Sequence, residues 1–235
     1  MSQTYLEETP LLNYTHASIQ SIIETNQWTV LTPYKKIGAV HHFVRDAIDF
    51  GYNHKDKLTA SEVLTKKYGQ CNTKSIVLMS LLRALNIPCK IEGFLVDSSF
   101  QGELLPKALR PFAPKHFLHT RVLVQYKENF VPLEGYILDK RYLLAIQKMY
   151  PHHEGPFSKY AVATDDLHAL NIEGNGHETA IQKNAIVKSL GVYNDPDTLF
   201  DKHDQPMGVF KRFIYSSVVR HLMNKRVKKI RHQIQ

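Results

Sequence analysis

The sequence has few cysteines and lacks any long apolar run. Cys71 and Cys89 are the only cysteines among 235 residues. Disulfide-built scaffolds are typical of much shorter secreted chains, so we expect both thiols to be free. No window approaches eighteen uninterrupted apolar residues, and the N-terminus has no basic segment followed by an apolar one. These absences argue against a membrane span and a secretory signal, and we expect a cytoplasmic protein.

The sequence also lacks a metal-binding pattern, although it contains 13 histidines. Two adjacent pairs stand out, His41-His42 and His152-His153. Adjacent residues on a helix point about 100° apart, so one such pair is not suited to hold one ion, and no His-Glu-x-x-His motif is present. The glycines show no phosphate-cradling pattern. We therefore expect neither a metal nor a cofactor.

The net charge of +8 is concentrated at one end of the chain. Residues 207–235 contain eight Lys and Arg and no carboxylate, whereas the remainder contains 22 basic and 22 acidic residues. The body therefore gives no strong nucleic-acid signal. The tail has two apolar lines at helical spacing, which favours a helix that packs on its own domain. Its basic end would then either face an anionic partner or be solvated with no dedicated partner. The two lines are Phe210, Phe213, Ile214, Val218 and Leu222, and Val219, Met223, Val227 and Ile230.

The length of the chain allows one catalytic domain with an appendage. We expect a catalytic domain over residues 1–165 and a helical C-terminal extension with the basic tail over residues 166–235. Within the extension, helices are expected near residues 179–190 and 210–230. Long loops are expected over residues 98–114 and 151–176, where specificity would be determined.

Helix signals dominate the first third of the chain. Apolar residues recur at helical spacing over residues 17–24 and 37–48, and Thr32-Pro33 is typical of a helix start. Thr59 and Glu62 form a capping-box signature. After Gly69, residues 71–85 again show a helical pattern, which places Cys71 at the first turn. A helix N-terminus favours a thiolate, so this position suits a nucleophile.

The second half of the predicted site lies on a hairpin. Residues 119–126 alternate between apolar and polar side chains, and residues 130–133 resume extended structure after a turn. Antiparallel neighbours lie about 5 Å apart, so the hairpin would bring His119 close to Glu134. Such a pair could serve a cysteine as base and orienting acid. His116 is an alternative base and Asp139 an alternative acid.

These segments carry a family resemblance. Residues 59–91, with Gly69-Gln70-Cys71, a long apolar helix and an Ile87-Pro88 step into a strand, resemble the nucleophile segment of the transglutaminase-like superfamily. Residues 119–134 resemble its second block, and residues 44–50 its preceding helix. The resemblance covers roughly residues 35–145.

The resemblance implies an α+β fold with a papain-like, transglutaminase-like core. In that fold the nucleophile helix packs on an antiparallel sheet that carries the histidine and the acid, and C-terminal helices would follow here. It also implies a Cys71-His119-Glu134 triad that forms a thioester at an amide carbonyl of a peptide or protein. The enzyme would be a peptidase or amidase, or a transglutaminase-type acyltransferase, because the triad does not set the acceptor.

Three positions depart from the family pattern. Arg121 and Phe130 stand where the family often has tryptophan, and the acid is Glu134 instead of aspartate. None of these differences removes a catalytic group. For the oxyanion, we expect the backbone N–H of Cys71 and one side chain, with Gln70 and Tyr52 as the candidates.

Two other functions stay open from the sequence. The domain could be a catalytically silent interaction module of the same family. Alternatively, the protein could bind an anionic membrane surface or nucleic acid through its basic tail.

Overall fold

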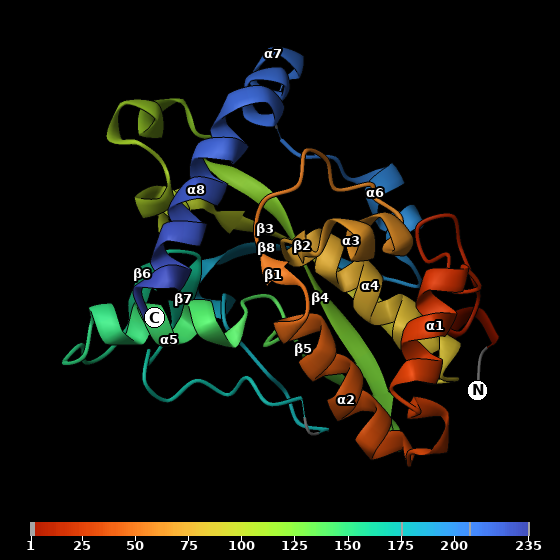
Figure 1. Cartoon of the computed structure of the whole chain (residues 1–235). Helices are drawn as coiled ribbons and strands as arrows, with labels where there is room; N and C mark the ends of the chain where they lie inside the picture. Colours follow the sequence, from red (N-terminus) through yellow and green to blue (C-terminus); the bar gives the residue numbers. More distant parts are fainter. Residues whose placement is uncertain (1–2, 175, 207, 235) are drawn as a thin grey trace.

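The structure is a computed structural model that describes residues 3–174, 176–206 and 208–234. Asn175, in the second expected loop, and Met207 and Gln235, in the basic tail, lie outside the described residues. Helices and an antiparallel sheet are combined in an α+β fold, as expected (Figure 1).

The main sheet has four antiparallel strands in the order β5-β4-β3-β8. They are β3 (Cys89–Asp97), β4 (His116–Tyr126), β5 (Asn129–Leu133) and β8 (Ile186–Tyr193). β4 and β5 form the predicted hairpin, although β4 begins three residues earlier than expected. The register pairs Val122 of β4 with Leu133 of β5. His119 therefore lies on β4, and Glu134 comes directly after the end of β5.

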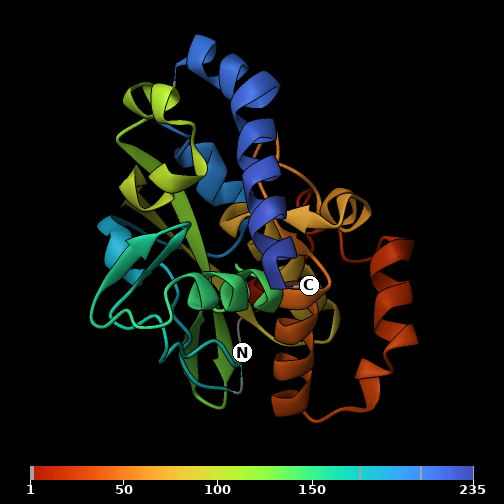
Figure 2. The same cartoon turned by 60° about the vertical axis from the view of Figure 1, so that its left-hand side comes forward.

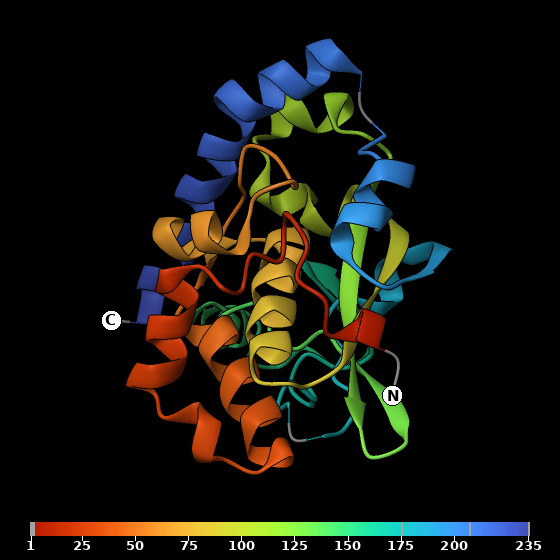
Figure 3. The ribbon, with the colours of Figure 1, turned by 90° about the vertical axis from the view of Figure 1, so that its right-hand side faces the viewer.

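The helix α4 (Cys71–Ala84) packs between this sheet and the N-terminal helices (Figure 3). Thirteen of its fourteen residues are buried, because it is covered on both sides. Its partners are α1 (Ala17–Thr25), α2 (Pro33–Asp46) and α3 (Ala60–Lys66). The prediction of a nucleophile helix packed on an antiparallel sheet is therefore confirmed.

The helix starts predicted in the N-terminal third of the chain are present in the structure. Thr32 precedes α2 with Pro33 at its first position, and Thr59 and Glu62 form the capping box of α3. Two two-residue strands, β1 (Asp49–Phe50) and β2 (Tyr68–Gly69), pair in parallel on either side of α3.

The prediction of a helix near residues 179–190 is wrong. Residues 183–185 form a single 3-10 turn, and β8 then pairs with the free edge of β3. Unpaired strand edges accept further strands readily, and this tertiary pairing prevails over the helical spacing of the apolar residues. β8 thus joins the sheet of the expected catalytic domain, although it lies beyond residue 165. The division at residue 165 stays a prediction.

The two expected loops contain short regular elements. Residues 98–114 hold two 3-10 helices, η3 (Ser98–Leu104) and η4 (Lys107–Phe112). Residues 151–176 hold a small hairpin of β6 (Phe157–Lys159) and β7 (Val162–Thr164), which follows α5 (Lys140–Met149). Both segments lie on the outside of the main sheet and of α4 (Figure 1).

The C-terminal segment is helical, as expected for residues 210–230. After α6 (Pro196–Lys202), it consists of α7 (Val209–Ile214), a π-helical turn η6 (Tyr215–Val219) and α8 (Arg220–Arg231). The end of α8 lies against α5 (Figure 2). Met223, Val227 and Ile230 are buried, so the second apolar line packs on the body of the protein. In the described part of the chain, no helix is both long and apolar enough to cross a bilayer.

Candidate active site

Cys71 is the first residue of α4, and its side chain is buried, with 5% of the residue exposed. Gln70 before it is extended, so the chain turns sharply into the helix. A Cβ added at Gly69 would lie 2.7 Å from Oγ1 of Thr73 and 3.0 Å from Cγ of Lys74. Glycine therefore permits the close approach that sets Cys71 at the helix N-terminus, where the dipole favours a negative charge.

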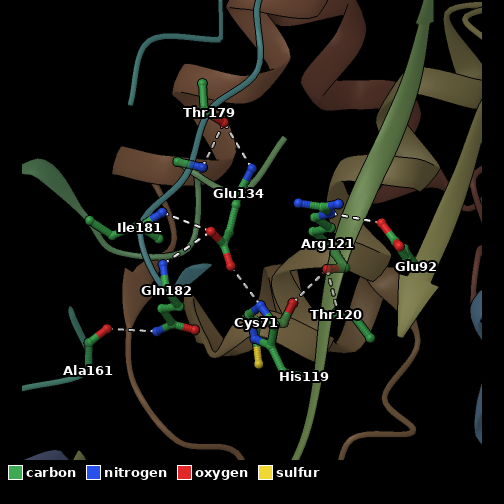
Figure 4. Close-up of polar contacts among 12 residues, drawn as sticks. Cys71, Glu92, His119, Thr120, Arg121, Glu134, Ala161, Thr179, Ile181 and Gln182 are labelled. Atoms are coloured by element: carbon green, nitrogen blue, oxygen red, sulfur yellow. Dashed lines mark hydrogen bonds and ion pairs between the residues drawn. The ribbon is translucent and has the colours of Figure 1, made fainter. Parts of the chain in front are cut away.

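His119 and Glu134 form a fully buried hydrogen-bonded pair. Nε2 of His119 lies 2.8 Å from Oε1 of Glu134, and neither residue is more than 1% exposed. The Cys71 sulfur lies beside the His119 ring (Figure 4). The other ring nitrogen, Nδ1, is buried and, among the described residues, has only the Cys71 thiol as a candidate partner. The hairpin thus presents an imidazole that is anchored on one side and available to the thiol on the other.

Electrostatics favour the protonated imidazole. Burial alone would lower the pKa of His119, but the charge and hydrogen bonding of Cys71 and Glu134 outweigh it and raise the pKa to about 10. Burial likewise acts to raise the pKa of Glu134, yet His119 and two backbone N–H groups hold that pKa below its usual value. A charged imidazolium beside a carboxylate is the arrangement that stabilises a neighbouring thiolate.

A segment that sequence reasoning missed fixes the carboxylate. The backbone N–H groups of Ile181 and Gln182 donate to Oε2 of Glu134 at 2.8 and 3.1 Å. The Thr179 hydroxyl accepts the N–H groups of Glu134 and Gly135, both at 2.9 Å (Figure 4). The contacts come mainly from backbone atoms, so no sequence motif could have identified this segment.

Asn72 links the start of α4 to β4. Its Nδ2 donates to the carbonyl of Leu118 at 3.0 Å, and its Oδ1 accepts from the Thr120 hydroxyl at 3.1 Å. The Cys71 thiol donates to the same oxygen at 3.5 Å. Since Leu118 and Thr120 flank His119, these bonds fix the position of the histidine relative to the cysteine. In the sequence, only its position next to Cys71 could have indicated that Asn72 belongs to the site.

The two oxyanion candidates differ in their availability. The Gln70 side chain is engaged, because its Oε1 accepts from the N–H of Asn53 at 2.8 Å and its Nε2 donates to Asp56 at 3.1 Å. The Tyr52 hydroxyl is buried and has no partner within the described residues. Burial, with smaller effects from ionisable neighbours that include Tyr142 and Cys71, raises the pKa of Tyr52 well above its usual value. Tyr52 is thus a neutral donor near the nucleophile.

The alternative base, His116, and the alternative acid, Asp139, lie outside the hydrogen bonds that join His119 and Glu134. His116 is the first residue of β4 and pairs with Asp97, three residues before His119. Asp139 caps α5 by accepting the N–H of Tyr142 at 2.9 Å, and it forms an ion pair of 2.6 Å with Arg231. No contact of either residue with His119 is present among the described residues. The geometry brings together Cys71, His119 and Glu134 instead.

Cys89 differs from Cys71 in its surroundings, although both residues are buried. It is fully buried in β3, and its thiol donates to the carbonyl of Met79 at 3.8 Å. Burial raises the pKa of this thiol to about 11. Both cysteines are free, as predicted. No group of three His, Cys, Asp or Glu side chains suited to a metal ion is found within residues 3–174, 176–206 and 208–234.

A cavity of about 800 Å³ opens at Cys71. Its walls come from residues 52–57 and 70–72, from the 98–114 segment, and from the C-terminal segment between Phe200 and Met223. Of the two loops expected to determine specificity, the described lining includes residues of 98–114 but none of 151–176. The contribution of the C-terminal helix to this wall was not predicted.

A known protein family and a solved structure are similar to this chain. A model of the transglutaminase-like superfamily matches residues 15–137, a range that includes Cys71, His119 and Glu134. A solved protein from Cytophaga hutchinsonii, described as a candidate cysteine protease, is similar with a TM-score of 0.46 and 13% identity over 82% of this chain. The chain spans 47% of that protein's length. No curated protein matches the sequence. The chain therefore belongs to the transglutaminase-like superfamily, whose chemistry depends on a cysteine nucleophile.

Proposed function

We propose that the protein performs acyl chemistry at an amide bond, with Cys71 as nucleophile, His119 as its base and Glu134 as the residue that orients the histidine. The buried hydrogen bond between His119 and Glu134 carries this proposal. It leaves Nδ1 of the ring for the Cys71 thiol. A cysteine enzyme needs this arrangement of an oriented imidazole next to a sulfur.

The chemistry follows from these positions. In the resting pair the thiol proton resides on Nδ1, and the Sγ thiolate of Cys71 attacks the amide carbonyl. The backbone N–H of Cys71 and the Tyr52 hydroxyl donate to the oxyanion. His119 then gives its proton to the leaving amine, and a thioester on Cys71 remains. Water resolves this thioester in a peptidase or amidase, whereas an amine resolves it in a transglutaminase-type transfer.

Selective labelling tests the nucleophile. Iodoacetamide at neutral pH should alkylate Cys71 much faster than Cys89, because only Cys71 adjoins an imidazole and a cavity. Peptide mapping by mass spectrometry measures both rates in one sample, with Cys71→Ala as the matched control. Equal labelling of the two cysteines, or none at Cys71, would contradict the proposal. Mass spectrometry of the trapped thioester would then identify the acyl group.

A second candidate function is binding of an anionic surface by the tail. The exposed side chains of Lys225, Arg226, Lys228 and Lys229 on α8 support it. Deletion of the tail is a poor test, since α8 also packs on α5. Replacing Lys225, Lys228 and Lys229 by glutamate should weaken binding to vesicles that contain phosphatidylserine. Unchanged binding of this triple variant to such vesicles would count against a tail interaction.

A further inference from the structure

The cavity at Cys71 is lined by both polar and apolar side chains. Charged and amide side chains, such as Asp56, Gln70 and Gln205, gather near the cysteine. Over the lining as a whole, which also includes Lys211 and Arg212, most of the exposed surface is apolar. The volume of about 800 Å³ lies within the range of ligand-binding pockets.

One apolar wall is formed by η3, η4 and the start of β4. It presents Leu105, Leu109, Phe112 and Phe117 to the cavity. Beneath it, Phe100 stacks on Phe117, with ring centroids 5.7 Å apart. Phe112 is 69% exposed, so most of its ring is open to contact from the solvent side.

The opposite wall is formed by the C-terminal helical segment. Ile214, Tyr215, Val219 and Met223 line the cavity from α7, η6 and α8. Figure 3 shows α7 and the 3-10 helices, in blue and yellow-green, at the same end of the molecule. The π-helical turn between α7 and α8 is of a kind that often occurs at functional sites. Two apolar surfaces thus face one cavity that leads to the nucleophile.

We propose that this cavity binds a long, unbranched acyl chain, so that the substrate is a fatty N-acyl amide with its carbonyl carbon at Cys71. The inference rests on the proposed function, because it assigns the acyl half of the same reaction. A peptide in this place would need partners for an N–H and a C=O at every residue. An alkyl chain needs none beyond its carbonyl, and its methylene groups gain from the apolar walls.

The reaction balances with water as co-reactant. Sγ of Cys71 forms a bond to the acyl carbon, the C–N bond breaks, and His119 protonates the leaving amine. Water then attacks the fatty acyl thioester, which releases a fatty acid and restores the thiol. No oxidation or reduction occurs, and the amine half can be a peptide or protein.

Chain-length dependence of covalent labelling tests the acyl site. Alkyl chloromethyl ketones place an acyl-like carbonyl next to the reactive carbon, and the thiol displaces chloride. The test uses chloroacetone and 1-chloro-2-tetradecanone, the latter below its aggregation concentration. Intact-mass spectrometry measures the rate at which each reagent labels Cys71. The apparent second-order rate constant should rise at least a hundredfold with the long chain, because each buried methylene adds affinity. Equal rate constants for the two reagents would overturn the acyl site.

A wall variant and a matched control locate the effect. Ile214→Gln places an amide on the cavity wall at a residue that is 37% exposed, so the fold should tolerate it. The ratio of long-chain to short-chain rate constants should fall at least tenfold. Val187→Gln makes the same kind of change at a residue of β8 that is 55% exposed and absent from the described lining. It should keep the ratio of the parent protein, and an identical ratio in all three proteins would contradict the assignment.

Binding without reaction separates the two proposals. Cys71→Ala should bind 11-(dansylamino)undecanoic acid saturably, with enhanced emission, and dansylglycine should not bind. Ile214→Gln in this background should weaken the binding at least tenfold. Saturable binding combined with a Cys71 that no reagent labels would support the acyl site and refute the nucleophile. A reactive Cys71 with no binding of the long probe and no chain-length dependence would refute the acyl site and leave the nucleophile in place.

Discussion

His119 lies next to two groups that carry negative charge when ionised, the Cys71 thiol and the Glu134 carboxyl. Its ring is buried, yet its pKa is raised to about 10 because these neighbours outweigh the cost of burying a charge. The imidazole should therefore stay protonated across the neutral range, ready to donate a proton to a leaving amine.

The titration of His119 provides a first prediction. In Glu134→Gln, loss of the carboxylate charge should lower the pKa of His119, because one of the two groups that raise it is gone. Nitrogen-15 NMR of the histidine rings measures this pKa directly. His116→Gln should leave the His119 titration unchanged, since no contact links the two residues among the described side chains. A His119 pKa near 6.5 in the parent protein would refute the charged pair.

A second histidine should respond to pH in the opposite direction. His41 on α2 is fully buried, and neither ring nitrogen has a partner within the described residues. Burial, followed by the charges of Arg45, His42 and Lys74, lowers its pKa well below 6.5. The folded state therefore holds this ring neutral, whereas the unfolded chain binds a proton below pH 6.5. The resulting stability is complete above pH 6.5 and is lost as the pH falls toward the lowered pKa.

The replacement His41→Leu tests this effect. At pH 7.5 the free energy of unfolding should change by less than about 1.5 kcal/mol, because leucine fills the site and no hydrogen bond is lost. Between pH 7.5 and 5.5, urea unfolding should show a smaller loss of stability than in the parent protein. His152→Leu at an exposed position is the control and should retain the full loss. An unchanged pH dependence in His41→Leu would show that other groups cause it.

At the scale of elements, patterns local in the sequence predicted their elements correctly, whereas a strand that depends on long-range pairing was missed. The capping box of α3, the helix start at Cys71 and the hairpin of β4 and β5 all depend on residues near one another in the chain, and all are present. The strand β8 depends on a free edge 90 to 102 residues away, and apolar spacing alone does not distinguish such a strand from a helix. The backbone donors of Ile181 and Gln182 could not be predicted for the same reason.

The segment that holds Glu134 provides a third prediction. In Thr179→Val the side chain keeps its shape, but the buried N–H groups of Glu134 and Gly135 lose their acceptor. Stability should fall by about 1–3 kcal/mol. Alkylation of Cys71 by iodoacetamide should also slow, because the displaced carboxylate no longer orients His119.

A matched threonine serves as the control for this prediction. Thr164→Val removes a hydroxyl that donates at 3.4 Å to the carbonyl of Asp166 on the β7 turn. Its alkylation rate should equal that of the parent protein. If the two variants had the same alkylation rate, the contacts of Thr179 would have no role at the site.

At the scale of the whole molecule, the last helix is fixed to the body by a buried ion pair. Arg231 of α8 contacts Asp139 at 2.6 Å, and its guanidinium also donates to the carbonyl of Phe50 at 2.8 Å. Near the middle of the helix, the Asn224 amide exchanges two hydrogen bonds with the backbone of Tyr52. The oxyanion candidate Tyr52 and the cavity wall are thus held by the same helix.

Breaking the ion pair provides a fourth prediction. In Arg231→Met, the buried Asp139 carboxylate loses its partner, which should cost about 3 kcal/mol of unfolding free energy in urea. Lys228→Met on the exposed face of α8 should change stability by less than about 0.5 kcal/mol. A stability loss of the same size in both variants would mean that the pair does not anchor the helix. Asp139→Asn should leave the pKa of His119 unchanged, in contrast to Glu134→Gln.

The wall that α7, η6 and α8 contribute to the cavity has an evolutionary consequence. Cys71, His119 and Glu134 lie within the stretch that matches the superfamily, whereas residues 209–223 lie beyond it. Under the proposed function, substitutions in this segment alter which acyl group fits while Cys71, His119 and Glu134 stay unchanged. On the same proposal, a few substitutions on one helix exchange one substrate for another, and the reaction at Cys71 persists.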